Sequence, residues 1–236
     1  MVGLEGPHLV EEALRAGLGV KCIVVGESMQ NWVQGLKLPH ETELLVAPND
    51  IIVSLLSTEA PQPVAALVEQ PKWSWEEALG QRDRAALVIV LAELQDPGNV
   101  GTILRSAEAF GATGVVSLPG TVNEWNAKTV RASAGSVLRM PVVSASVEEC
   151  FARLHDAGVT VMTTAVDGAL NAARSDLRKP VALILGNEGA GVPREIAGKA
   201  DGAVTIDCPG PVESLNAAVA ASVLLYEAAR QRSAKR

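Results

Sequence analysis

The second part of this 236-residue chain alternates short apolar runs with amphipathic stretches, and this alternation constrains the fold more than any other feature. Apolar runs without polar interruption are typical of parallel strands, because helices cover both faces of such a sheet. Strands are predicted at residues 87–92, 114–118, 141–143, 159–165, 181–185 and 203–206. Helices are predicted at residues 99–110, 124–134, 147–156, 193–200 and 214–230. The pattern therefore predicts an α/β fold with a mostly parallel sheet and helices on both faces.

A shorter alternating pattern precedes this part and predicts a separate small α/β domain at residues 1–70. Its first helix is expected at residues 6–17, with Pro7 in the first turn and Gly17 at the end. Strands are expected at residues 21–25, 44–47 and 64–68, and a helix-like stretch at 48–55. Residues 71–84 contain Pro71, Trp73, Trp75 and mixed charges, so a linker is predicted there. The larger domain is then expected at residues 85–236.

Composition narrows the classes of protein to which the chain can belong. Hydrophobic residues make up 48% of the chain and aromatic residues only 3%, so a core of Val, Ile, Leu and Ala is expected. No apolar run reaches the roughly 18 residues of a membrane helix, and the first residues lack the order of a secretory signal. We therefore expect a soluble protein of the cytoplasm. The three cysteines and three histidines are scattered, so neither a disulfide framework nor a metal site is expected.

The net charge of −7 argues against a protein that binds nucleic acid through a broad basic face. If RNA is the substrate, a local patch must hold it. The residues that could supply this patch are Arg82, Arg84, Arg105, Lys128, Arg131 and Arg139. Lys128 and Arg131 are three apart on a predicted helix, so both could contact phosphate oxygens, although a solvated helix face would use the same residues.

Three glycine-containing segments follow three of the predicted strands, and the first of them follows residues 87–92. Its sequence is Asp96-Pro-Gly-Asn-Val-Gly-Thr-Ile-Leu-Arg-Ser-Ala-Glu108. The Pro-Gly pair predicts a turn, and Asn99 is a good N-cap for the helix that follows. Arg105 and Glu108 are three apart on the polar face of this helix, where a surface ion pair between them would explain both.

The second and third segments follow the last two predicted strands. In Gly186-Asn-Glu-Gly-Ala-Gly191 the glycine spacing differs from that of a dinucleotide-binding turn. Glycines at the carboxyl end of a strand let the backbone approach a ligand closely, although a strand-to-helix turn alone would explain two of them. In Cys208-Pro-Gly-Pro-Val-Glu-Ser-Leu-Asn216, the prolines and the glycine predict an irregular loop.

The final helix is predicted to start at Ser214 as its cap and to pack through Leu215, Val219 and Val223. Asn216 then lies inside the helix, where asparagine is mildly unfavourable. A local structural reason for this residue is therefore weak, which favours a functional one.

Spacing, order and residue type in these three segments resemble the signature motifs of the SpoU family of RNA ribose 2′-O-methyltransferases, a branch of the SPOUT class. The resemblance covers roughly residues 87–229. It implies methyl transfer to a ribose 2′-hydroxyl of RNA, with S-adenosylmethionine as cofactor. It also implies a deep trefoil knot near the carboxyl terminus and a homodimer in which an arginine reaches the cofactor of the neighbouring subunit.

The resemblance implies roles for individual residues. The implied catalytic residues are Arg105, Asn99, Glu188, Ser214 and Asn216. The implied cofactor-binding residues are Thr164, Ala165, Leu185, Gly186, Asn187, Gly191, Ile206, Ser214, Leu215 and Asn216. The implied RNA-binding residues are Lys128, Arg131 and Arg105, and no metal is needed.

Two roles for Arg105 stay open. It could act as the base that accepts the hydroxyl proton, or it could remain a cation that orients a phosphate and the developing oxyanion. We favour the second role, because neutralising a guanidinium at pH 7 costs about 7 kcal/mol.

Residues 1–70 resemble the small ribosomal-protein-like RNA-binding domain often attached to these enzymes. The likeness lies in Gly6-Pro-His-Leu-Val-Glu-Glu-Ala-Leu and in Ser57-Thr-Glu-Ala-Pro-Gln-Pro-Val-Ala-Ala-Leu. This domain favours ribosomal RNA as the substrate. The alternatives are a transfer RNA 2′-O-methyltransferase and a non-catalytic RNA-binding factor of ribosome assembly. A nucleotide-dependent dehydrogenase is disfavoured by the lack of a GxGxxG turn.

Overall fold

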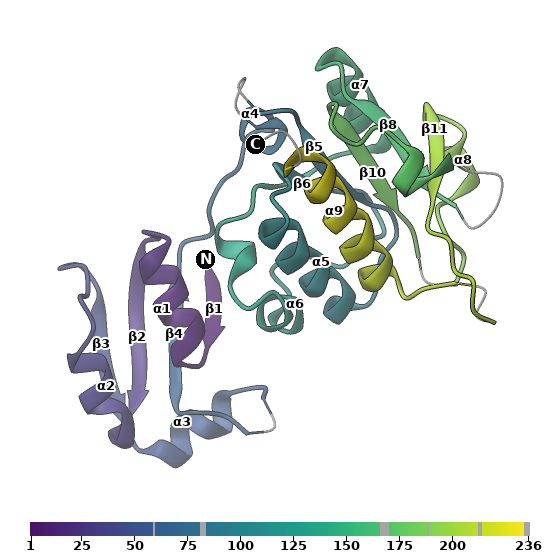
Figure 1. Ribbon diagram of the computed structural model, residues 1–236. Coiled ribbons are helices and arrows are strands. Elements are labelled where there is room, and N and C mark those ends of the chain that lie inside the picture. Colours follow the sequence, from purple (N-terminus) through teal and green to yellow (C-terminus); the bar gives the residue numbers. More distant parts are fainter. Residues whose placement is uncertain (59, 81–83, 166–169, 188, 212–213, 234–236) are drawn as a thin grey trace. The chain divides into compact units, whose positions relative to one another are not determined.

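The computed structural model describes residues 1–236 with the exception of 59, 81–83, 166–169, 188, 212–213 and 234–236. The chain forms two compact units, Met1–Lys72 and Trp73–Arg236 (Figure 1). Within the described part, none of the helices combines the length and the apolar character needed to cross a bilayer.

The first unit is a four-stranded sheet with the order β1-β4-β2-β3. Its strands are β1 (Val2–Glu5), β2 (Val20–Gly26), β3 (Glu43–Ala47) and β4 (Val64–Val68), and its helices are α1 (Pro7–Arg15), α2 (Gln30–Gln34) and α3 (Asn49–Leu55). In α1, Pro7 occupies the first turn, as the sequence predicts, and Leu9, Val10 and Ala13 are buried. Strand β1 was not predicted, because four residues that include Gly3 give too short a pattern.

The second unit is a seven-stranded parallel sheet with the order β7-β6-β5-β10-β8-β11-β9. Its strands are β5 (Leu87–Leu91), β6 (Gly114–Ser117), β7 (Val142–Ser144), β8 (Thr160–Thr164), β9 (Leu170–Asn171), β10 (Val181–Leu185) and β11 (Gly202–Thr205). The two central strands, β5 and β10, are fully buried over their whole length. Burial on both faces explains why these strands contain only apolar residues.

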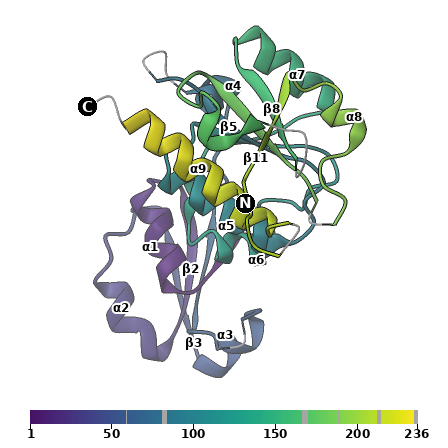
Figure 2. The same cartoon turned by 45° about the vertical axis from the view of Figure 1, so that its right-hand side comes forward.

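Helices cover both faces of this sheet (Figure 2). On one face α5 (Pro97–Ala109) packs beside α9 (Ala217–Ser233), and α6 (Ala127–Ala132) packs on α5. The other face carries α4 (Trp75–Leu79), α7 (Val147–Asp156) and α8 (Arg194–Ala197), which share one apolar cluster with alternate residues of the central strands. The predicted α/β class, with its mostly parallel sheet, is confirmed.

The prediction of a linker at residues 71–84 is wrong for part of that segment. Ser74 caps α4 through a capping box with Glu77, and the buried Ala78 belongs to the core of the second unit. Trp73 and Trp75 pack against the same cluster. Their large apolar rings are partly buried there, so α4 belongs to the second unit rather than to a connection.

The predicted packing stripe of the final helix is also wrong. Helix α9 begins at Ala217, and its buried residues are Ala217, Ala218, Ala221, Leu224, Leu225 and Ala228. Val219 and Val223 are 49% and 38% exposed. The helix is apolar around most of its circumference, so the pattern alone could not distinguish the face that meets the core.

Candidate functional site

A cavity of about 880 Å³ opens at the carboxyl edge of the sheet in the second unit. Its wall consists of the ends of β8, β10 and β11, the segments that follow them, and the first turns of α9. The lining residues are Thr164, Ala165, Leu185, Gly186, Asn187, Gly189, Ala190, Gly191, Val204, Thr205, Ile206, Asp207, Cys208, Ser214, Leu215, Ala217, Ala220 and Leu224. Open α/β sheets bind ligands at this edge, because the loops that follow parallel strands gather there.

Most residues that were predicted to bind the cofactor lie in this wall. They are Thr164, Ala165, Leu185, Gly186, Asn187, Gly191, Ile206, Ser214 and Leu215. The strand ends are held together around them: the Thr164 hydroxyl donates to the Ile184 carbonyl at 3.0 Å, and the Ala165 amide donates to the Val204 carbonyl at 3.1 Å. Asn216, Asn99 and Arg105 are not among the described lining residues.

The loop after β10 is closed by a small antiparallel bridge between Asn187 and Gly191. Their backbones exchange two hydrogen bonds, of 3.0 and 2.8 Å. The Asn187 side chain supports the loop from inside, since its Oδ1 accepts from the amides of Gly189 and Ala190 at 2.9 and 3.3 Å. Its Nδ2 donates to the Glu93 carbonyl at 3.3 Å and so connects the loop to the end of β5. Glu188, a predicted catalytic residue, lies outside the described residues.

Gly186 has a steric role that the sequence did not show. A Cβ added at this position would overlap the backbone of Gly191 and Val192. Backbone atoms cannot move aside as the end of a side chain can, so only glycine allows the loop to fold back this tightly.

The third motif ends at Asn216, which the structure places before α9 rather than inside it. The Oδ1 atom of Asn216 accepts from the amides of Ala218 and Val219 at 2.9 and 3.3 Å. This side chain is therefore the N-cap of the helix, and the prediction that Ser214 caps it is wrong. The expectation of a weak local structural reason for Asn216 is wrong as well, because capping satisfies amides that otherwise lack an acceptor.

A hydrogen bond from Asn216 Nδ2 to Asn99 Oδ1, at 3.1 Å, joins the third motif to the first. The predicted N-cap Asn99 is replaced in that role by Asp96, whose Oδ1 accepts from the Asn99 amide at 2.9 Å. This hydrogen bond is the main reason why the pKa of the Asp96 carboxyl lies below its usual value, and Lys128, at 3.7 Å, adds to the effect.

Arg105 and Glu108 do not form the surface ion pair that their spacing allowed. Glu108 instead accepts two hydrogen bonds from Arg139, at 2.6 and 2.9 Å. Burial opposes ionisation of Glu108, but the hydrogen bonds from Arg139 and Ser136 outweigh it and lower the pKa of the carboxyl. Arg105 is exposed on α5 and makes no ion pair or side-chain hydrogen bond within the described part of the chain. Its guanidinium is accessible to a ligand.

The expected basic patch is smaller than the sequence indicated. Arg84 donates to the Gly111 carbonyl at 2.5 Å and Arg139 pairs with Glu108, so both have structural partners. Arg82 lies outside the described residues. Lys128 and Arg131 stand on α6, whose Thr129 and Val130 face the interior.

The chemistry of the cavity wall distinguishes between classes of ligand. Among the described lining residues, Asp207 is the one charged side chain, and neither lysine nor arginine is present. Polyphosphate ligands normally require cations or a helix N-terminus aimed at the phosphate. A neutral to acidic wall with apolar groups from Leu215, Ala220 and Leu224 suits a ligand that carries a positive charge beside a flat ring.

Sequence reasoning missed several residues of the site. Ala217, Ala220 and Leu224 line the cavity from α9, and no signal in the sequence shows which face of this helix they occupy.

Gly101, which supports the site by helix packing, could have been found, because a glycine inside a helix indicates close packing. A Cβ there would lie 2.5 Å from Ala132 Cβ, so this glycine lets α6 approach α5. Among all the described residues, no group of three or more His, Cys, Asp or Glu could hold a metal ion.

Known proteins resemble this chain over most of its length. The model of the family described as "SpoU rRNA Methylase family" matches residues 86–226. The 23S rRNA (guanosine(2553)-2′-O)-methyltransferase RlmP of Bacillus subtilis is 36% identical over 94% of this chain and 86% of its own length. The 23S rRNA (uridine(2479)-2′-O)-methyltransferase of Streptomyces viridochromogenes is 32% identical over 86% of this chain and 73% of its own length.

Solved structures show the same fold over nearly the whole chain. The SpoU methyltransferase AviRb from Streptomyces viridochromogenes, in complex with the cofactor AdoMet, superimposes with a TM-score of 0.86 and 28% identity. The match covers 99% of this chain and 91% of that one. The family model, the relatives and the fold agree, and the chain therefore belongs to the SpoU rRNA methylase family.

Proposed function

We propose that this protein transfers a methyl group from S-adenosylmethionine to a ribose 2′-hydroxyl of ribosomal RNA. The observation that carries the proposal is the cavity at the carboxyl edge of the sheet. Its wall contains residues of the second and third motifs, and Asn99 of the first motif is hydrogen-bonded to Asn216, which lies between the lining residues Leu215 and Ala217.

The residues of the cavity fit the cofactor. A volume of about 880 Å³ is ample for a nucleoside with an amino-acid tail, since ligand pockets span about 300–1,000 Å³. We assign the adenine to the part of the wall at Leu185 and Ile206, where Ala220 and Leu224 add apolar surface. When bound, S-adenosylmethionine supplies a methyl group on a positively charged sulfur. The described wall carries no cation that would repel this charge.

The transfer leaves S-adenosylhomocysteine and releases the hydroxyl proton to solvent, so the chain's own residues have to align the acceptor oxygen and stabilise its developing charge. Arg105, exposed on α5, holds a phosphate or the developing oxyanion of the RNA by its charge. Asn99 and Asn216 fix the start of α9 beside α5 and so orient Ser214 and Leu215 in the wall. Lys128 and Arg131 on α6 contact the RNA backbone. Glu188 acts in the same site.

The active form is a homodimer with α9 at its interface. Val219, Val223 and Tyr226 are 49%, 38% and 56% exposed on α9, and their spacing places them in one stripe. A shallow hollow of about 310 Å³ beside them is lined by Thr102, Ala218, Val219, Ser222, Val223 and Tyr226. An exposed apolar stripe of this kind supports an interface between subunits. The deep trefoil knot expected from the family is part of this proposal.

The proposal gives the two units different tasks. Residues 1–70 bind the RNA and residues 85–236 carry out the methyl transfer. Two relatives that span both units are named as methyltransferases of 23S ribosomal RNA, and this supports ribosomal RNA as the substrate. The protein then works in the cytoplasm, where ribosomes are assembled.

The test combines binding with site mapping. We expect S-adenosylmethionine to bind the purified protein in calorimetry, and the protein to transfer tritiated methyl groups to ribosomal RNA from a deletion strain but not to RNA from the parent strain. Mapping of 2′-O-methyl groups in both strains then locates the target. Methyl transfer to transfer RNA alone would show that transfer RNA is the substrate. RNA binding without cofactor binding would favour a non-catalytic factor of ribosome assembly.

A further inference from the structure

Helix α9 packs on its neighbours through very small side chains. Four of its six buried residues are alanines, namely Ala217, Ala218, Ala221 and Ala228. Small side chains form low ridges, so apart from Leu224 and Leu225 the helix offers little to interlock with its neighbours. Directional polar contacts then add to what fixes its position along its axis.

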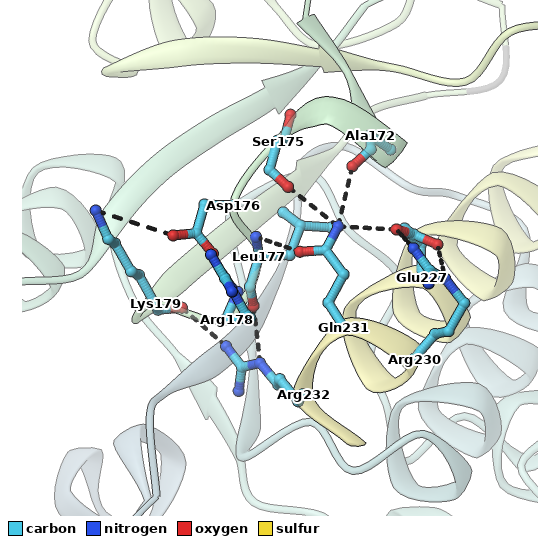
Figure 3. Close-up of polar contacts among 10 residues, drawn as sticks. All are labelled: Ala172, Ser175, Asp176, Leu177, Arg178, Lys179, Glu227, Arg230, Gln231 and Arg232. Atoms are coloured by element: carbon cyan, nitrogen blue, oxygen red, sulfur yellow. Dashed lines mark hydrogen bonds and ion pairs between the residues drawn. The ribbon is translucent and has the colours of Figure 1, made fainter. Parts of the chain in front are cut away.

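The carboxyl-terminal end of α9 carries such contacts. The Gln231 side chain donates through Nε2 to the carbonyls of Ala172 and Ser175, at 3.4 and 3.0 Å, and accepts from the Leu177 amide at 2.9 Å (Figure 3). Nε2 also lies 2.8 Å from Glu227 on the same helix. One amide side chain thus holds the helix to three points of the segment that precedes β10.

Arg232 holds the next turn to two segments at once. Its guanidinium donates to the carbonyls of Ala85 and Ala86, at 2.6 and 2.9 Å, just before β5. It also donates to the carbonyls of Leu177 and Lys179, at 2.8 and 2.9 Å, just before β10. Burial lowers the pKa of this guanidinium. Arg232 therefore connects α9 to the starts of the two central strands.

These contacts reach the cavity from both sides. Ala172 directly follows β9, which pairs with β11 through Val204 and Thr205, and both of these residues line the cavity. On the helix itself, Ala220 lines the cavity twelve residues before Arg232, about 18 Å along the axis. A shift of the end of α9 would therefore move the wall formed by α9 relative to the wall formed by β11.

We infer that Gln231 and Arg232 are positioning residues for the cofactor cavity. They lie at the opposite edge of the sheet and hold α9 in the position in which it forms one wall of the cavity. The inference rests on the proposed function for the identity of the ligand. Both residues lie beyond Tyr226, where the match to the family model ends.

The experiment measures S-adenosylmethionine binding by calorimetry for the full chain and for Gln231→Ala, Arg232→Ala and Arg232→Lys. We expect the two alanine variants to bind about three- to tenfold more weakly, and the lysine variant to recover part of the loss. Arg230→Ala is the matched control, because Arg230 is exposed and pairs only with Glu227 on its own helix among the described residues. It should bind like the wild type.

A second control separates positioning from general stability. Leu154→Ala opens a cavity under α7, in the cluster on the other face of the sheet, and should lower the melting temperature without weakening the binding. If Arg232→Ala and Arg232→Lys bind as tightly as the wild type, the inference is wrong and these contacts serve the fold alone.

Amide hydrogen exchange tests the positioning role of Arg232 separately from the proposed function, because it needs no ligand. In the ligand-free protein, Arg232→Ala should exchange faster than Arg230→Ala at β11 and at the first turn of α9. If the wild type binds no S-adenosylmethionine, the proposed function fails, and equal exchange in these two variants would then refute the positioning role independently.

Discussion

The Nδ2 atom of Asn216 donates a hydrogen bond across 3.1 Å to the Oδ1 atom of Asn99, which lies 117 residues earlier in the chain. The Oδ1 atom of the same side chain caps α9. One amide therefore starts the final helix and ties it to the first motif. The contact with Asn99 and the capping of α9 can be tested separately, because an aspartate at position 216 retains the capping oxygen and lacks the N–H group.

Asn216→Ala should lower the free energy of unfolding by about 1–2 kcal/mol, since it removes the cap. Asn216→Asp keeps the capping oxygen and should remain close to the wild type in stability, but its second oxygen faces Asn99 Oδ1 without a proton between them. We expect about tenfold slower methyl transfer in this variant. Denaturant titration and single-turnover kinetics measure the two effects. Unchanged transfer by Asn216→Asp would show that the contact with Asn99 is not needed.

Arg105→Ala should slow methyl transfer by about 100-fold or more, because it removes a charge that acts on the reacting oxygen. Cofactor affinity should stay within about twofold, since Arg105 lies outside the described wall of the cavity in its own subunit. Arg153→Ala, an exposed arginine on α7, is the control and should behave like the wild type. Loss of affinity with normal transfer at saturation would contradict the role assigned to Arg105.

Gly186→Ala should abolish cofactor binding, because its methyl group would overlap the backbone at Gly191 and force the loop open. Gly189→Ala is the matched change in the same loop. There the added Cβ lies 3.6 Å from Asn187 Oδ1, an ordinary contact, so binding should be close to that of the wild type. Calorimetry compares the two variants. Equal affinities would refute the steric argument.

Arg139→Met should lower the free energy of unfolding by about 1 kcal/mol at pH 7, because the partly exposed Glu108 loses its partner. The fold lowers the pKa of Glu108, so the stabilisation is complete above the unfolded pKa of about 4.3 and is lost as the pH falls through the folded pKa. The difference between variant and wild type should therefore shrink between about pH 5 and pH 3. Denaturant titrations across this range measure it, and a constant difference would exclude the ion pair as its cause.

Val223→Glu should convert a dimer into monomers, because it places a carboxylate in the exposed apolar stripe of α9. Leu170→Glu changes another exposed apolar residue, on β9, and should leave the association unchanged. Sedimentation velocity separates the two species. A wild type that sediments as a monomer at all concentrations would remove the dimer from the proposal.

Much of the larger sheet could be predicted because its strands are buried on both faces. Strand β10 has the predicted bounds, Val181–Leu185, and α7 has the predicted bounds, Val147–Asp156, since Ser146 caps it and its apolar residues follow the helical period. Helix α4 was missed because Pro71 and the mixed charges around Trp73 and Trp75 are typical of a connection. The sequence alone does not show the apolar cluster against which these two rings pack.

The edge of the sheet that carries the cavity could also be predicted, since glycine-rich segments followed the strands. The face of α9 could not, because alanines and valines surround this helix and its hydrophobic period is weak. The capping by Asn216 was missed for a related reason: the helix start lies two residues after the position that Ser214 suggested. The catalytic and cofactor-binding roles of individual residues stay predictions.

The order in which the cavity wall appears along the chain has a consequence for biosynthesis. The wall begins at Thr164 and is completed by Leu224 in the last helix, so a ribosome must release nearly the whole polypeptide before the pocket can close. The sheet strands emerge earlier and can pair without it. Under the proposed function, binding of the methyl donor is therefore a late event in maturation, and a chain that ends before α9 would lack one wall of this cavity.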